Sequence, residues 1–115
     1  MISLKNSVRL IGFLGNTPDI TKYGENKSLA RASIATNVSY KNKDGDWVSD
    51  TQWHNLVMWG RHAVFAEKSL DKGSEVAIEG KLVNRTYTDK EGIVRYLTEV
   101  VVNEIITFTR KEKVF

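Results

Sequence analysis

The chain contains no cysteine and only one proline among its 115 residues. The absence of cysteine excludes disulfide bonds, thiolate metal sites and cysteine nucleophiles. A single proline excludes a proline-rich linker. No stretch approaches the roughly 18 apolar residues of a membrane-spanning helix, and residues 1–9 contain no apolar run of signal-peptide length. We therefore expect an intracellular protein in a reducing compartment, the cytoplasm, with no membrane contact.

The sequence also offers little to catalysis. His54 and His62 are the only histidines, and neither has a carboxylate at metal-ligand spacing. The pair Gly12 and Gly15 lies in an apolar, strand-like segment, so it does not form a phosphate-binding loop. We predict neither an enzyme, nor a metal site, nor a cofactor.

Size and charge set the remaining bounds. A chain of 115 residues is long enough for one domain with a hydrophobic core and too short for two. The net charge is +3 and the isoelectric point about 9.2. This mildly basic balance permits a polyanionic partner without demanding one.

Most of the chain alternates between apolar and polar residues, which predicts strands. The segment 27–39 is the clearest, since Ala30, Ala32, Ile34, Thr36 and Val38 share one face. Residues 16–19 indicate a turn, and Asp44-Gly45 and residues 89–92 indicate hairpin tips. The predicted strands cover residues 7–15, 27–39, 47–60, 75–87 and 95–108.

One segment departs from this alternation. Residues 61–70 have helical spacing and no glycine or proline, and Gly73 provides a stop signal after them. The order is three strands, one short helix, then two strands. This order is that of the all-β OB-fold, a five-stranded Greek-key barrel that binds oligonucleotides or oligosaccharides.

Aromatic residues fall on the polar side of two predicted strands. Trp53 and Trp59 are six residues apart, so a strand directs both rings to one face, opposite Leu56 and Met58. In a small barrel such rings also commonly fill the core, but the register argues for the outside here.

The strand over residues 75–87 gives the same result. If Val76, Ile78 and Leu82 point inward, then Arg85 and Tyr87 point outward. Rings flanked by cations on one side of a sheet are typical of single-stranded nucleic acid binding, because every base has a face to stack and every phosphate needs a counter-charge.

Several short motifs, in this order, resemble the OB-fold domain of bacterial-type single-stranded DNA-binding proteins. The resemblance runs over residues 6–108, and its motifs are Thr51-Gln52-Trp53-His54-Asn55, Met58-Trp59-Gly60-Arg61, Lys72-Gly73-Ser74, Glu79-Gly80-Lys81-Leu82, Thr86-Tyr87-Thr88-Asp89 and Tyr96-Leu97-Thr98-Glu99-Val100-Val101-Val102.

This resemblance implies roles for particular residues. Bases would stack on Tyr40, Trp53, Trp59 and Tyr87, and phosphates would contact Lys43, Arg61, Lys72 and Arg85. Some members carry arginine where this chain has Asn55, which removes one expected phosphate contact. The resemblance further implies a nucleoid-associated homotetramer, paired through the first strand, that protects single-stranded DNA during replication, repair and recombination.

The last predictions concern the extent of the domain and the alternative functions. Residues 1–110 are expected to form the DNA-binding domain, and residues 111–115 a short basic end instead of the acidic tip that recruits replication and repair proteins in the family. Either that tail has been removed or this is a short member without it.

Two alternative functions stay open: a primosomal-type OB-fold replication accessory protein, and an OB-fold protein-interaction module. RNA also remains a possible ligand, since rings and cations do not sense the sugar hydroxyl.

Overall fold

The computed structural model describes residues 4–25 and 27–108, so the basic end predicted at 111–115 lies outside the described residues. Within these described residues, six strands and one helix follow one another. They are β1 (Val8–Leu14), β2 (Asp19–Lys22), β3 (Ser28–Lys41), β4 (Trp47–Trp59), α1 (Arg61–Ser69), β5 (Glu75–Thr88) and β6 (Val94–Thr107).

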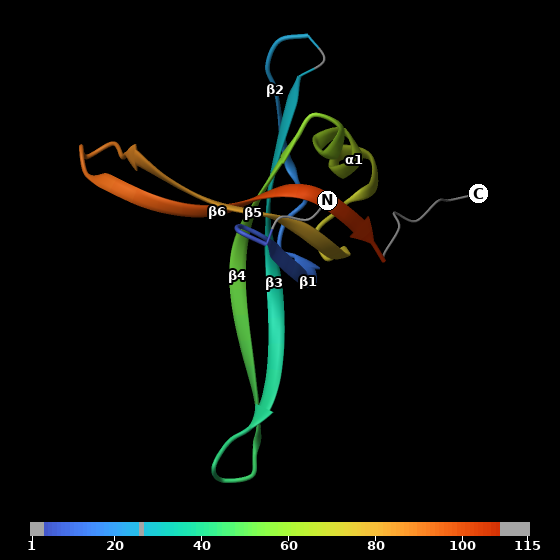
Figure 1. Cartoon of the computed structure of the whole chain (residues 1–115), viewed down its shortest axis with the longest axis vertical. Coiled ribbons are helices and arrows are strands. Elements are labelled where there is room, and N and C mark those ends of the chain that lie inside the picture. Colours follow the sequence, from blue (N-terminus) through green and yellow to red (C-terminus); the bar gives the residue numbers. More distant parts are fainter. Residues whose placement is uncertain (1–3, 26, 109–115) are drawn as a thin grey trace.

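Five of the strands close into a barrel (Figure 1). The hydrogen-bonded order is β1-β5-β6-β4-β3, and β1 also pairs with β3 to complete the circle. Only the β4–β6 pairing is parallel among the pairings described. The closure needs a glycine on β1, because a Cβ at Gly12 would lie 2.0 Å from the carbonyl oxygen of Ala35 on β3. The predicted five-stranded OB-fold, with its helix between β4 and β5, is confirmed.

The core fills the barrel with the residues that the alternation directed inward. Ala63 and Ala66 of α1 add to it from outside the sheet. The buried cluster consists of Leu14, Ala30, Ala32, Ile34, Leu56, Met58, Ala63, Ala66, Leu70, Val76, Ile78, Val100 and Val102. Because the buried residues of α1 and most of those of β3 are alanines, these two elements pack closely against the core.

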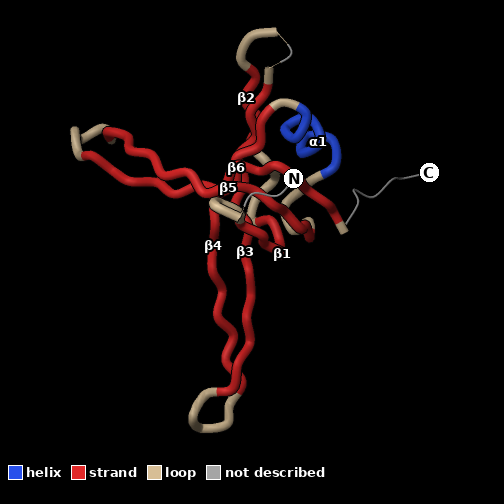
Figure 2. The backbone as a smooth tube through the Cα atoms, in the orientation of Figure 1, coloured by secondary structure: helices blue, strands red, loops and turns tan. Residues whose placement is uncertain are grey.

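Two long hairpins extend from the barrel in different directions (Figures 1 and 2). The first, named here the β3–β4 arm, comprises residues 36–52, and the second, the β5–β6 arm, comprises residues 84–98. Leu82 was predicted to point inward with Val76 and Ile78, and this prediction is wrong, since Leu82 is exposed. Val38, which shares a face with the buried Ala30, Ala32 and Ile34, is exposed as well. Val38 lies on the β3–β4 arm, beyond the barrel, whereas Leu82 pairs with the buried Val100 and is nevertheless exposed.

The strand boundaries otherwise agree with the sequence to within two residues. The exception is β2, for which no strand was predicted. It pairs only with the edge of β3, from Asp19↔Arg31 to Lys22↔Ser28, and its four residues are too few for alternation to be recognised. In the described part of the chain, no helix has the length and apolar character needed to cross a membrane.

Candidate nucleic-acid interface

The two predicted tryptophans lie on the outer face of the barrel. Trp53 and Trp59 pair with Ala35 and Leu29 on β3, and their exposed fractions are 60% and 46%. Leu56 and Met58, on the opposite side of β4, are buried. The predicted orientation of both rings is therefore confirmed. By alternation Val57 lies on the same outer face, yet it is buried, because it lies between Arg31 of β3 and Val101 of β6.

Neighbouring groups hold both rings in position. A Cβ at Gly15 would lie 2.4 Å from Cζ3 of Trp53, so the indole rests directly against the backbone at Gly15. The ring of Trp59 meets the ring of Tyr23 edge to face, with centroids 5.9 Å apart, a favourable aromatic geometry. Rings fixed in this way lose little side-chain entropy when a ligand stacks on them.

The two predicted tyrosines are exposed on the arms or at their bases. Tyr87 pairs with Arg95 on the β5–β6 arm. Tyr40 pairs with Val48 on the β3–β4 arm. Because side chains alternate along a strand, this register puts Tyr40 on the opposite side of the β3–β4 ladder from Trp53.

A third tryptophan, Trp47, was not predicted from the sequence to bind nucleic acid. Trp47 opens β4, its exposed fraction is 71%, and the Lys41 ammonium lies 5.8 Å from its ring centroid. The signal was present, because Trp47, Trp53 and Trp59 are spaced by six residues and an even spacing keeps all three on one side of the strand. Trp47 thus extends the row of rings into the β3–β4 arm.

The four predicted cations do not form one cluster. Lys43 lies at the tip of the β3–β4 arm, and Arg61 begins α1 directly after Gly60. Lys72 lies between α1 and β5, where its backbone N–H donates to Thr17 Oγ1 at 3.2 Å. Of the four, only Arg85 lies within a strand, on β5 at the base of the β5–β6 arm. The positive charge is therefore spread from an arm tip to the end of the helix.

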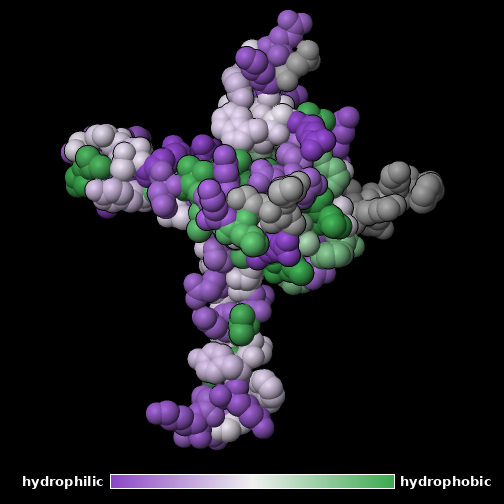
Figure 3. Space-filling model, in the orientation of Figure 1, coloured by the Kyte–Doolittle hydropathy of each residue, from purple (hydrophilic) through white to green (hydrophobic). Residues whose placement is uncertain are grey.

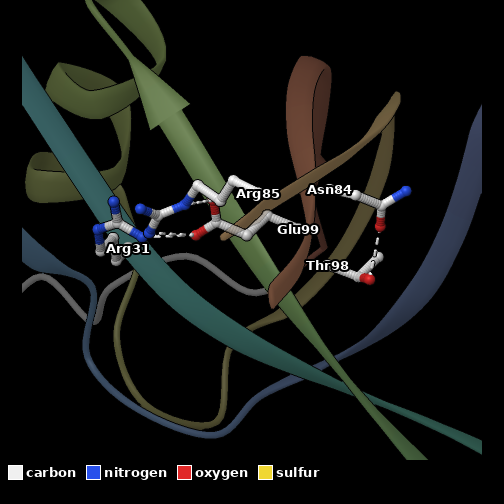
Figure 4. A network of polar contacts seen from close by, with 5 residues as sticks. All are labelled: Arg31, Asn84, Arg85, Thr98 and Glu99. Atoms are coloured by element: carbon white, nitrogen blue, oxygen red, sulfur yellow. Dashed lines mark hydrogen bonds and ion pairs between the residues drawn. The ribbon is translucent and has the colours of Figure 1, made fainter. Parts of the chain in front are cut away.

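A buried carboxylate, also missed by the sequence analysis, lies on the outer face. Glu99 of β6 is 5% exposed, and it accepts hydrogen bonds from Arg31 of β3 at 2.5 Å and from Arg85 of β5 at 2.8 Å (Figure 4). Burial raises the pKa of the Glu99 carboxyl, but the two arginines outweigh it and the net pKa is lowered. The hydrogen bond between Arg85 and Glu99 raises the pKa of Arg85. Residues 31, 85 and 99 are too far apart in sequence for a local pattern to indicate this pairing.

Features that would suggest catalysis are not seen in residues 4–25 and 27–108. This part of the chain holds no group of three or more metal-ligating side chains. His54 lies on the side of β4 opposite Trp53, with its Nε2 3.3 Å from Thr36 Oγ1.

In the space-filling view the arms are mainly hydrophilic, and hydrophobic residues gather over the barrel (Figure 3).

Comparison with known proteins decides the family. The model of the single-strand binding protein family matches residues 5–108. The chain belongs to this family. It is 41% identical over 101 residues to the single-stranded DNA-binding protein of Xanthomonas axonopodis pv. citri (strain 306), covering 87% of this chain and 56% of that protein. It is 38% identical over 108 residues to single-stranded DNA-binding protein 1 of Xylella fastidiosa (strain 9a5c), covering 93% of this chain and 79% of that protein.

A solved member of the family has the same fold. The structure described as "Plasmodium falciparum SSB complex with ssDNA" superposes with a TM-score of 0.81 at 28% sequence identity, covering 95% of this chain and 98% of that one. The chain thus spans little more than half of one bacterial relative and nearly all of this structural relative.

Proposed function

We propose that this chain binds single-stranded DNA without strong sequence preference. The observation that carries the proposal is the pair of fixed, exposed rings of Trp53 and Trp59 on one outer face of the barrel. A base stacked on such a ring contributes about 1–3 kcal/mol whatever its identity. The names of the bacterial relatives, and the single-stranded DNA in the structural relative, support the same ligand.

The remaining predicted residues extend this surface. Bases stack on Tyr40 and Tyr87 as well, and phosphates contact the four cations Lys43, Arg61, Lys72 and Arg85. Tyr40 and Trp47 give the β3–β4 arm a ring on each side, which suits a strand that winds around the arm. In the cytoplasm, on the nucleoid, such a protein holds exposed DNA open during replication, repair and recombination, and it catalyses no reaction.

An exposed apolar stripe supports assembly into the homotetramer. Ile11 and Ile106 are joined across the sheet through Ala77, and Phe13 and Phe108 flank Glu75 in the next row. All four apolar side chains are exposed. A contiguous apolar patch on strands is characteristic of a protein interface, and a second copy of β1 is the partner we propose. Light scattering should give the mass of four chains, and a monomer at micromolar concentration would contradict this assembly.

Intrinsic tryptophan fluorescence tests the DNA-binding function directly. Titration with oligo(dT) should quench the emission strongly and to saturation, since Trp53 and Trp59 stack on bases. The affinity should fall as salt increases, with a slope of roughly −0.7 per phosphate contact. Duplex DNA of equal length should bind much more weakly, because its base faces are hidden. Equal affinity for duplex and single strand would overturn stacking, and quenching only by a protein partner would favour the interaction module.

A further inference from the structure

The contacts of Glu99 leave much of each arginine available to a ligand. Arg31 uses Nη1 alone, and Arg85 uses Nε with a longer contact of 3.5 Å from Nη2. A guanidinium has five N–H donors in one plane. The arginine side chains remain 44% and 43% exposed, although the carboxylate between them is buried. The cluster therefore presents N–H groups at the surface of the outer face.

Arg31 and Glu99 of the cluster line a hollow on the outer face. The hollow has a volume of about 290 Å³, and Asn16, Arg31, Ser33, Asn55, Leu97 and Glu99 are among its lining residues. Asn16 is fixed there, because its Oδ1 accepts hydrogen bonds from the backbone N–H and the hydroxyl of Ser33. The residue before it, Gly15, carries the Trp53 ring. A base stacked on Trp53 would thus bring an adjacent phosphate toward the arginines.

The charges decide where an anion binds. Asp19, which pairs with Arg31 across the β2–β3 ladder, also lines the hollow. Its carboxylate and that of Glu99 disfavour a phosphate deep in the hollow. The exposed guanidinium groups favour one above it, where a planar N–H fork matches two phosphate oxygens.

We propose that Arg31 is a phosphate-binding residue, and that Glu99 is the positioning residue that holds Arg31 and Arg85 side by side for one phosphodiester of the bound strand. This inference rests on the proposed function. Fixing both guanidinium groups before the DNA arrives lowers the entropy cost of the contact. The competing interpretation is that the three residues form an ion-pair cluster that only stabilises the fold.

Salt dependence separates the two interpretations. Arg31→Gln should weaken oligo(dT) binding on the order of tenfold, equally for all base sequences, and make the slope of log K against log salt shallower by about 0.7. The matched control is Lys68→Gln, which removes the same charge from the exposed end of α1 and should leave the slope unchanged. If Arg31→Gln behaves like Lys68→Gln, the proposal is wrong.

Two further variants cover the remaining outcomes. If Arg31→Gln fails to fold in a thermal melt, Arg31→Lys keeps the charge and loses the fork. It should then bind several-fold more weakly at an unchanged slope, and wild-type affinity would overturn the proposal. Glu99→Gln adds one net positive charge, so electrostatics alone would tighten binding. A folded Glu99→Gln protein should instead bind more weakly, because the arginines are no longer held, and tighter binding would contradict the positioning role.

The same experiment keeps the two proposals apart. If the unaltered chain fails to bind oligo(dT), the proposed function fails and this inference fails with it. If the unaltered chain binds and quenches normally while Arg31→Gln matches its control, only the role of Arg31 and Glu99 is lost.

Discussion

The β3–β4 and β5–β6 arms end in the same turn but carry different charges. At the first tip the Asn42 Oδ1 accepts hydrogen bonds from the backbone N–H groups of Asp44 and Asp46. At the second, the Asp89 Oδ1 accepts them from Glu91 and Ile93, at the same spacing. A glycine with positive φ follows three residues later in each case, Gly45 at 83° and Gly92 at 79°. The side chains of Asn and Asp both carry an Oδ1 oxygen, which is the acceptor that this turn requires.

The difference between the tips lies in what surrounds that oxygen. The carboxylate of Asp89 also binds Arg95, at 2.9 Å, so the β5–β6 tip neutralises its own arginine. The amide of Asn42 has no charge, and the β3–β4 arm places Lys41 over the exposed ring of Trp47. Lys41 thus lies beside a ring on one arm, whereas Arg95 is held in an ion pair on the other. We infer that the β3–β4 arm contributes more to DNA binding than the β5–β6 arm beyond Tyr87.

The largest expected effect comes from removing the exposed ring of Trp47 on the β3–β4 arm, compared with removing Tyr96 on the β5–β6 arm. Trp47 and Tyr96 are both highly exposed, at 71% and 84%. Trp47 shares the side of β4 occupied by Trp53, whereas Tyr96 pairs with Thr86 and so faces away from the side that Tyr87 occupies. Trp47→Ala should weaken oligo(dT) binding by about 5- to 150-fold, the equivalent of about 1–3 kcal/mol for one stacked base.

Tyr96→Ala is the matched control for this measurement. It should change the affinity less than twofold, because Tyr96 faces away from the side that Tyr87 occupies. The same fluorescence titration can be used, because Trp53 and Trp59 are retained. Equal losses of affinity in the two variants would show that the arms contribute alike, and the inferred larger contribution of the β3–β4 arm would be wrong.

Much of this arrangement could be predicted from alternation alone. Each barrel strand, the helix and the outward orientation of Trp53 and Trp59 follow from local periodicity. Alternation fixes the side of a strand on which a residue lies, but not where the barrel ends along it. For that reason Val38 shares a face with the buried Ala30, Ala32 and Ile34 and yet is exposed on the β3–β4 arm. The ion pairs of Glu99 depend on partners 14 and 68 residues away, which no local pattern reports.

A smaller effect is expected from breaking the turn at one tip. Asn42→Ala removes two hydrogen bonds, each with a net contribution of about 0.5–1.5 kcal/mol. Amide hydrogen exchange at Asp44 and Asp46 should accelerate by roughly 2- to 10-fold, while the amides of Glu91 and Ile93 keep their rates. Asn42→Asp retains the oxygen and should preserve the protection. Faster exchange at both tips in Asn42→Ala would mean that the arms open together rather than separately.

The smallest effect is the pH response of the second tip. The backbone N–H of Ile93 lowers the pKa of the Asp89 carboxyl most, and Arg95 lowers it further. A carboxyl whose pKa is lower in the folded chain than in the unfolded chain stabilises the fold above its usual value of 3.8. That contribution is lost as the pH falls through the lowered folded value. The neutral Asn42 gives the β3–β4 tip no such response of its own.

Carboxyl carbon NMR measures this difference residue by residue. The Asp89 midpoint should lie below 3.8. Arg95→Gln should raise it only part of the way, because the Ile93 N–H still donates to the carboxylate. In Asn42→Asp the new carboxyl accepts two backbone N–H groups but has no arginine partner, and its charged neighbours, Lys41, Lys43, Asp44 and Asp46, balance in sign. Its midpoint should therefore lie above that of Asp89. A midpoint at or below that of Asp89 would mean that the turn backbone alone controls the titration and that Arg95 does not distinguish the two arms.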